Sequence, residues 1–377
     1  MSVWDDLVGQ PAAVAVLRQA AAGGPHTMTH AWLVTGPPGS GRSNAARAFA
    51  AALQCPDGGC GHCHTCRTAL AGTHPDVTVV RTEQLSIGVD EVRRLVRRAA
   101  MSPTLGPWQV IVVEDADRVT ERGADALLKA VEEPAPRTVW LLCAPTADDV
   151  VVTIRSRCRQ LRLVTPADAA VAQLLAERDG VAPARAEFVA RIAQGHIGRA
   201  RGLARDPEAM ERRRAVLELP QSLAGLGDCL AAAARLVKAA EADAAQATAD
   251  LDGRERDALN QTLASGGTRG PRVRHAAAAL KELTEQQQLR TKRYQRDGLD
   301  AALTELTGYY RDVLVRQTAP AVPLLNSDFA AAVDQTAAQS TPETTVRRLD
   351  AILAARQAME GNVAPLLAFE ALFVALL

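Results

Sequence analysis

Aromatic side chains make up only 3% of this 377-residue sequence, so its core must be built mainly from alanine, leucine and valine. No uncharged apolar run approaches the roughly 18 residues that a membrane-spanning helix needs. The first residues, MSVWDDLVGQ, lack the basic start and apolar middle of a signal peptide. We therefore expect a cytoplasmic protein that makes no membrane contact.

The charge balance limits the ways in which the protein can bind DNA. Its 43 basic side chains are matched by 43 acidic ones, so no overall field attracts the protein to nucleic acid. Any contact with DNA must therefore come from a local basic face. Two basic clusters, at 93–98 and 290–296, have helical spacing and are more simply explained as solvated faces or subunit contacts.

Short apolar runs rich in β-branched residues alternate with helical patterns in the first half of the sequence. The predicted strands are 30–35, 77–80, 110–113 and 139–143, and the predicted helices are 45–53, 89–100 and 121–133. This alternation is typical of an α/β domain with a parallel sheet.

Changes in periodicity along the chain predict three domains. Residues 1–165 form the α/β domain, residues 166–209 a small helical lid, and residues 210–377 an all-helical domain. A long charged helical insertion lies at about 240–296 within the last domain. The sequence GGTRGP at 266–271 interrupts it, which predicts a tip between two long antiparallel helices.

A glycine-rich loop, GPPGSGRS, joins the first predicted strand to the helix after it, which is the setting of a phosphate-binding loop. Glycines allow backbone N–H groups and the helix N-terminus to converge on an anion. The P-loop pattern GxxxxGK[ST] requires lysine at position 42, where this sequence has an arginine, whose guanidinium is planar and larger. The candidate nucleotide-binding residues are Gly36, Gly39, Gly41, Arg42 and Ser43, of which Ser43 would contact a bound metal ion.

An acidic pair, Glu114 and Asp115, follows the predicted strand 110–113. ATPases use acids at such a strand end to hold Mg²⁺ and polarise the attacking water, usually in the order Asp then Glu. Here the order is inverted. Because a misplacement of about 1 Å can cost roughly a hundredfold in rate, the inversion and Arg42 together argue against ATP hydrolysis by this chain. Binding of ATP or ADP with Mg²⁺ stays open.

Four of the seven cysteines lie close together in the sequence: Cys55, Cys60, Cys63 and Cys66. Their spacing, with glycines between them that permit tight turns, predicts a closed structural zinc site. An iron–sulfur cluster is the alternative. His62 and His64 are nearby substitutes as ligands, but the regular two-residue gaps favour the cysteines.

The sequence TIRSRC at 153–158 ends the α/β domain. Taken alone, its arginines are most simply a solvated turn. Together with the loop and the acidic strand, however, the order of motifs resembles the clamp-loader branch of the AAA+ ATPases, which includes subunits of bacterial DNA polymerase III. The segments that carry the resemblance are WDDLVGQ at 4–10, HAWLVTGPPG at 30–39, the four-cysteine insertion, ALLKAVEEP at 126–134 and IRSRC at 154–158. They span about residues 4–210, and the last third matches only in being helical.

The resemblance implies a non-motor subunit of a clamp loader, without ATP turnover of its own. Arg157 would be an arginine finger that acts in trans on ATP bound to a neighbouring subunit, and the four cysteines would form a structural zinc module. The C-terminal domain would oligomerise into a collar. The implied partners are tau/gamma ATPase subunits and a delta subunit in a hetero-pentamer, which places a sliding clamp on primer–template DNA.

Two alternatives belong beside this hypothesis. The first is the ATP-hydrolysing tau/gamma subunit, which Arg42, the inverted acids and Gly198 argue against, because the ATPase subunit has a nucleotide-sensing arginine at the position of Gly198. The adjacent Arg199 is a substitute that keeps this alternative open. The second is a stand-alone P-loop enzyme or helicase loader, which requires the missing lysine.

Overall fold

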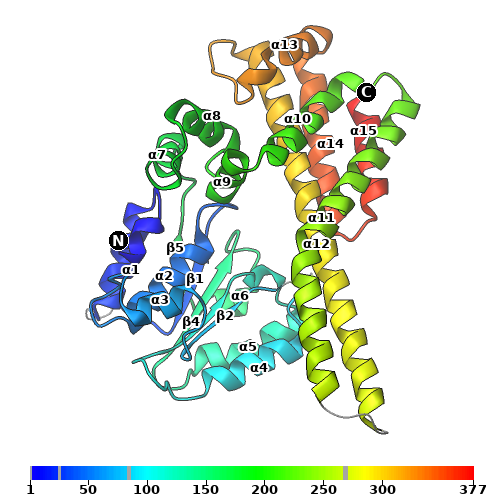
Figure 1. Cartoon of the computed structure of the whole chain (residues 1–377). Helices are drawn as coiled ribbons and strands as arrows, with labels where there is room; N and C mark the ends of the chain where they lie inside the picture. The colour runs from blue at the N-terminus through cyan, green and yellow to red at the C-terminus, as the bar shows by residue number, and fades with distance from the viewer. Residues whose placement is uncertain (1, 24–26, 83–85, 266–270) are drawn as a thin grey trace. The chain divides into compact units, whose positions relative to one another are not determined.

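The computed structural model describes residues 2–23, 27–82, 86–265 and 271–377, without the side chains of 262–265, 271–279 and 282 (Figure 1). The chain divides into two compact units, Met1–Arg205 and Asp206–Leu377. The finer division into three domains stays a prediction. Among the described residues, no helix combines the length and the apolar character needed to span a membrane.

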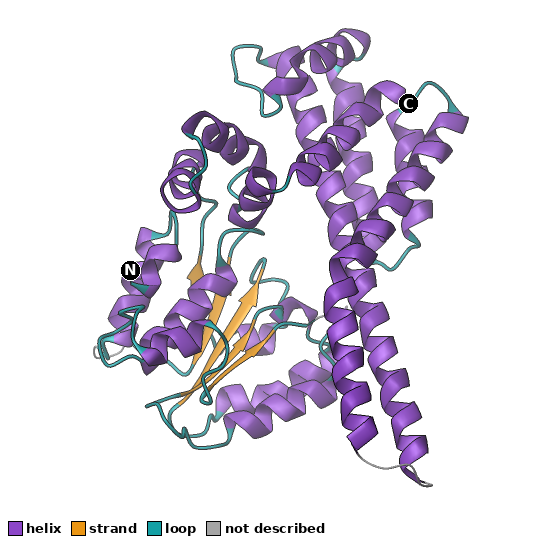
Figure 2. Cartoon of the chain, in the orientation of Figure 1, coloured by secondary structure: helices purple, strands orange, loops and turns teal. Residues whose placement is uncertain are grey.

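The first unit contains a five-stranded parallel sheet, which confirms the predicted α/β fold (Figure 2). The strands are β1 (Ala31–Thr35), β2 (Val77–Val80), β3 (Gln109–Val113), β4 (Thr138–Ala144) and β5 (Arg159–Arg162), in the order β2-β3-β4-β1-β5. Strand β5 was not predicted from the sequence. It is an edge strand whose only buried residue is Leu161, so it lacks the apolar run that marked the other four.

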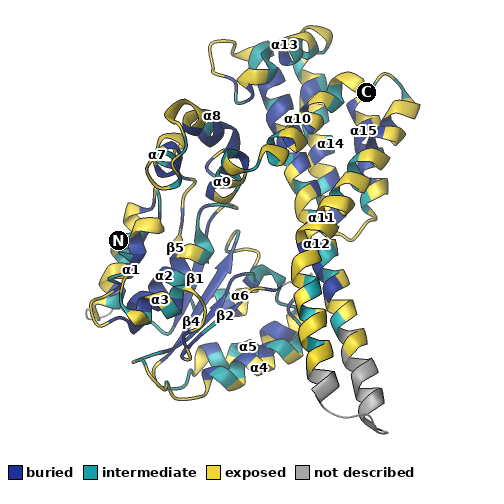
Figure 3. Ribbon diagram, viewed as in Figure 1, coloured by how far each residue is buried: buried dark blue, intermediate teal, exposed yellow. Residues whose placement is uncertain are grey.

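Helices cover both faces of this sheet, and both faces are apolar. In β1, Trp32 and Val34 join the core cluster that contains Phe49, whereas Leu33 joins the opposite cluster with Leu127. Figure 3 shows the strands of this sheet largely buried. The helices of this unit are η1 (Val3–Asp6), α1 (Pro11–Ala21), α2 (Arg42–Gln54), α3 (His64–Leu70), α4 (Val89–Ala99), η2 (Ala116–Arg118), α5 (Glu121–Glu132), α6 (Val152–Arg155), α7 (Asp168–Asp179), α8 (Pro183–Ala193) and α9 (Ile197–Arg205). Because both faces of the sheet are apolar, we expect the polar functional side chains at the strand ends and in the loops.

The described residues of the second unit form helices joined by loops, with no strand among them, which confirms the predicted all-helical C-terminal region. Its elements are α10 (Pro207–Ser222), α11 (Leu226–Ser265), α12 (Pro271–Thr318), η3 (Ser327–Phe329), α13 (Ala330–Gln339), α14 (Pro342–Glu360) and α15 (Pro365–Leu376). Its core gathers around the fully buried rings of Tyr309, Tyr310, Phe369 and Phe373. Helix α15 contributes Phe369 and Phe373 to this core, as its apolar sequence predicts.

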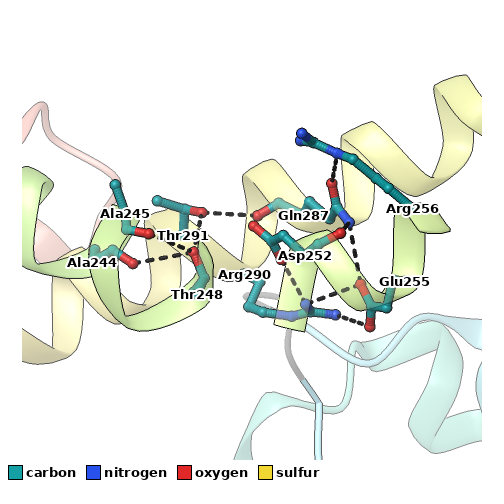
Figure 4. Close-up of polar contacts among 9 residues, drawn as sticks. All are labelled: Ala244, Ala245, Thr248, Asp252, Glu255, Arg256, Gln287, Arg290 and Thr291. Carbon is teal, nitrogen blue, oxygen red and sulfur yellow. Dashed lines mark hydrogen bonds and ion pairs between the residues drawn. The ribbon is translucent and has the colours of Figure 1, made fainter. Parts of the chain in front are cut away.

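Helices α11 and α12 pair antiparallel, and a polar network joins them (Figure 4). Arg290, only 5% exposed, donates to Oδ1 of Asp252 at 2.7 Å and to Oε1 of Glu255 at 2.8 Å. Gln287 donates to the carbonyl of Asp252 at 3.0 Å. Buried polar partners fix the register of two paired helices, because any shift leaves charges unpaired. The tip predicted at 266–271 lies outside the described residues except for its last position.

Replacing Arg290 with alanine should weaken this hairpin. Removing one partner of a fully buried ion pair costs about 3–5 kcal/mol, and we expect about 2 kcal/mol because Asp252 and Glu255 are partly exposed. Urea unfolding followed by circular dichroism measures the loss. The exposed Lys292 is the control, since Lys292→Ala should change stability little. Equal losses for the two variants would contradict the role assigned to Arg290.

The same substitution should alter the response to acid. The hydrogen bond from Arg290 lowers the pKa of Glu255 from its ordinary value of about 4.3. A carboxyl with a lowered folded pKa stabilises the protein above its unfolded pKa, and that contribution is lost as pH falls through the folded value. Below about pH 4, the wild type should therefore lose more stability than Arg290→Ala does.

Candidate functional site

The predicted phosphate loop lies between β1 and α2, at the carboxyl end of the sheet. Gly39 and Gly41 have φ values of +79° and +92°, which L side chains rarely adopt, so glycine is required at both. Helix α2 begins at Arg42, directly after Gly41 and three residues before the predicted start. Its first N–H groups therefore face the loop, as an anion site requires.

Helix α9 and the residue before it cover the loop. A Cβ atom on Gly39 would lie 2.2 Å from Cγ of His196, so the predicted lid segment contacts the loop without intervening space. A cleft of about 210 Å³ opens beside this contact. It is lined by Gly39, Gly41, Arg42, Ser43, Asn44, Ile197, Gly198 and Arg201. Gly36, Glu114 and Asp115 are not among the described residues that line it.

Two arginines and two helix N-termini give this cleft a positive character. Arg42 Nη1 donates to the carbonyl oxygen of Gly36 at 2.6 Å, so its guanidinium folds back onto the loop. Arg201 was not anticipated from the sequence, and its Nε bonds to Asp179 at 2.8 Å. Burial, with the charges of Arg199 and Arg42, lowers the pKa of His196, which keeps this ring neutral at neutral pH. The cleft is suited to a small anionic group.

The acidic pair already has arginine partners. Glu114 is buried and accepts from Nε of Arg47 at 2.6 Å, and Asp115 lies 4.0 Å from Nε of Arg118. Arg47 was missed in the sequence, although it lies one helical turn after Ser43 and therefore on the same side of α2. A Mg²⁺ ion would have to displace Arg47 to reach Glu114. The anion-binding half of a nucleotide site thus fits this structure, whereas at Glu114 a metal ion would compete with Arg47.

The four predicted cysteine ligands converge on one point. Their sulfur atoms all lie within 4.8 Å of one another, and Cys55 Sγ is 3.7 Å from that of Cys60 and 3.8 Å from that of Cys63. Tetrahedral coordination with Zn–S bonds of about 2.3 Å places sulfurs about 3.8 Å apart, so the geometry fits zinc. His62 and His64 are exposed and are not part of this group.

The backbone around Cys55 favours its thiolate form. Burial raises the pKa of this thiol, but N–H groups of Cys60, Gly59 and Asp57 outweigh burial and lower the pKa to about 6. Burial raises the pKa of Cys66, as does its contact with the Cys63 and Cys55 sulfurs. A bound metal ion would favour the thiolate form of all four cysteines, because each sulfur would then share its charge with the cation. The cluster can therefore hold a metal ion.

Arg157 follows α6 and lies on the surface, with 39% of its side chain exposed. It forms an ion pair with Glu132, and its Nη1 donates to the carbonyl of Thr153 at 2.8 Å and to Oγ of Ser156 at 3.1 Å. None of these partners belongs to the phosphate loop. Glu132 lies in the ALLKAVEEP segment, so two segments that carried the resemblance meet at this ion pair.

Comparison with known proteins gives consistent matches. Residues 9–167 match the family described as DNA polymerase III, delta subunit. The delta' subunit of DNA polymerase III from Pseudomonas aeruginosa is 38% identical over 170 residues, which are 44% of this chain and 52% of that protein. The delta' subunit from Bacillus subtilis is 26% identical over 339 residues, or 89% and 87% of the two chains. The gamma/tau subunit from Mycobacterium tuberculosis is 34% identical over 184 residues, or 47% and 32%.

The sheet, the phosphate loop and the helical segments after them define a P-loop fold of the AAA+ type. Within this class, the chain is related to the delta-prime subunits of bacterial DNA polymerase III, which agrees with the clamp-loader resemblance of its motifs. The matching segment spans about half the length of the Pseudomonas protein and about a third of the gamma/tau subunit.

Metal analysis of the purified protein should find about one zinc ion per chain, as expected for one closed site. Cys63→Ala should lose the metal, because three thiolates leave the site open to water. His62→Ala is the matched control and should retain it, since this exposed ring lies outside the sulfur cluster. Iron in place of zinc, or zinc retained by Cys63→Ala, would contradict the assignment.

Proposed function

We propose that this chain is a non-motor clamp-loader subunit of the DNA polymerase III holoenzyme, which helps load the sliding clamp onto primed DNA. One observation carries the proposal: the arginine that the resemblance marks as a finger is exposed, and its contacts lie away from the chain's own phosphate loop. The relationship to delta-prime subunits supports it. In this role the chain acts on a nucleotide held by its neighbour.

Arg157 is the residue that would act in trans. A guanidinium that reaches the transferring phosphoryl group stabilises its charge and contributes a factor of roughly 10³ to 10⁵ in rate. In the chain alone, Glu132 neutralises Arg157. Exposed ion pairs contribute only about 0–1 kcal/mol, so the phosphate of a neighbouring subunit can replace this carboxylate at little cost. Before that phosphate binds, the contacts to Thr153 and Ser156 orient the guanidinium.

The chain's own nucleotide site has a different role in this proposal. Gly39, Gly41, Arg42 and Ser43 line a cleft for an anion such as the phosphates of ATP or ADP. The bond between Arg47 and Glu114 occupies the acid that would hold Mg²⁺. Hydrolysis at this site is therefore not expected, which argues against the alternative of an ATP-hydrolysing tau/gamma subunit.

The second unit supports assembly with other subunits. Its helices α14 and α15 expose large apolar side chains, including Leu353 at 52% and Leu367 at 61%. Exposed apolar residues that gather on neighbouring helices are typical of surfaces buried in an oligomer. We assign this surface to contacts with tau/gamma and delta subunits in a hetero-pentamer. The sliding clamp and primer–template DNA would then be engaged through the complex.

Arg157→Ala should leave the fold, the metal content and the assembly unchanged and lower the DNA-stimulated ATPase of the reconstituted complex. At the one neighbouring site that receives Arg157, hydrolysis should fall by about 10³-fold or more. Arg157→Lys should not restore it, since an ammonium cannot reproduce the two-pronged contact of guanidinium with phosphate.

Arg155→Ala is the matched control, because Arg155 is two residues away and pairs with Asp148 instead. If Arg155→Ala is as damaging as Arg157→Ala, local charge is responsible and no single finger exists. If neither variant changes hydrolysis, the trans-acting role is wrong and the subunit is purely structural.

A further inference from the structure

The first residues of the chain lie on the cysteine cluster. Oγ of Ser2 and the backbone N–H of Val3 both donate to the carbonyl oxygen of Gly59, at 2.9 and 3.1 Å. Nε1 of Trp4 donates to the carbonyl oxygen of Gly58 at 3.2 Å. Both acceptors belong to the loop between Cys55 and Cys60, so their positions depend on how these cysteines are held.

The packing at this contact leaves little freedom. Val3 and Trp4 are only 3% and 4% exposed. Gly59 has a φ of +103°, and a Cβ atom there would lie 2.6 Å from Cγ2 of Val3. The close approach exists because residue 59 is glycine in a left-handed conformation. If the cysteine loop rearranges, the residues that rest on it must move as well.

The same N-terminal segment, residues 2–10, also holds the lid. Arg178 of α7 forms an ion pair with Asp6, and its Nη2 donates to the carbonyl oxygen of Asp5 at 2.6 Å. These are the residues directly after Trp4. The short 3-10 helix Val3–Asp6 therefore contacts the cysteine loop through its first two residues and helix α7 through its last two.

The far end of the segment reaches the junction between the sheet and the lid. The side chain of Gln10, 3% exposed, accepts from the N–H of Val164 at 3.0 Å and donates to its carbonyl at 2.6 Å. It also donates to the carbonyl of Ser40 in the phosphate loop at 3.3 Å. Gly9 packs on Pro166, which begins the lid. The side chain of Gln10 thus links the phosphate loop to the segment that connects the sheet to the lid.

We propose that residues 2–10 couple the cysteine cluster to the lid and the phosphate loop, so that metal bound at the cluster keeps the lid in place over the cleft. The proposal rests on the zinc site proposed above. A metal ion fixes the sulfur atoms and hence the carbonyls of Gly58 and Gly59. The N-terminal segment carries that constraint through Arg178 and Gln10, both of which contact it directly. Loss of the metal should therefore loosen α7, far along the sequence from the cysteines.

Amide hydrogen exchange of the full chain, with zinc bound and after its removal by a chelator, tests this coupling. In the wild type, zinc removal should speed exchange in residues 2–6 and in α7 by at least about fivefold, the lower end of typical coupling between sites. Strand β3 and helix α5 should not change. Arg178→Met should speed exchange of α7 with zinc bound, and zinc removal should then add less there than in the wild type, because only the link through Gln10 remains. Because coupling is reciprocal, this variant should also bind zinc more weakly, by the part of the coupling factor that it removes.

Arg185→Met is the matched control, since Arg185 lies in the lid but donates to the carbonyl of Leu203, at 3.2 Å, and should leave the response of α7 to zinc intact. If zinc removal loosens 55–66 and α7 does not respond, or if α7 of Arg178→Met responds as strongly as in the wild type, the coupling is wrong and the zinc site stands. Faster exchange throughout β3 and α5 would also overturn it, because the metal would then stabilise the whole unit. If no zinc binds, or its removal leaves 55–66 unchanged, the proposed zinc site itself fails.

Discussion

Strands β1, β3 and β4 are buried along their whole length, and this constraint governs where chemistry can occur in the first unit. Their interior side chains are apolar, and the polar ones, Thr35, Gln109 and Thr138, lie at strand ends, so polar groups gather where the parallel strands end. The phosphate loop follows β1, and the acids follow β3. Helix α2 crosses this edge and brings Arg47 to Glu114 at 2.6 Å. The ion pair therefore joins the two halves of what would be a hydrolytic site.

Under the proposed function, this arrangement would let a P-loop fold act on a nucleotide held by a neighbouring subunit. Arg42 and Arg47 each bond to a group of their own site, the carbonyl of Gly36 and the carboxylate of Glu114. The positive cleft beside them fits an anion, whereas the acid for a metal ion is occupied. Arg157 differs from these two arginines, because it is exposed and its Glu132 partner is easily displaced. In the proposed role, the chain keeps the P-loop fold and presents one charged group, Arg157, to a neighbouring subunit.

The sequence predicted those parts of the fold that have strong local patterns. Strand β2 has the predicted bounds, 77–80, and helix α4 ends within one residue of its predicted end. Strand β5 was missed because Arg159, Gln160 and Arg162 are exposed, so pairing with β1 decides its conformation and no apolar run marks it. The start of α2 was placed late, since a left-handed glycine begins it and no side chain caps it.

The candidate residues were found from motifs, but their partners were not. Arg47 and Glu114 are 67 positions apart, and His196 reaches Gly39 from the other end of the unit. Such contacts depend on tertiary packing and leave no periodic trace in one sequence. The convergence of the four cysteines was easier to predict, because their short spacing limits how far apart the sulfurs can lie.

We propose that this chain contributes to ATP hydrolysis at a neighbouring subunit's site. The most direct measurement compares steady-state ATP hydrolysis by the isolated chain with hydrolysis by the DNA-stimulated clamp-loader complex, assembled with and without it. The account predicts that the isolated chain turns over far more slowly than about 1 per second, a slow rate for an ordinary enzyme, and that the complex needs the chain for full stimulation. Turnover of about 1 per second or more by the chain alone, or full stimulation of the complex without it, would contradict the account.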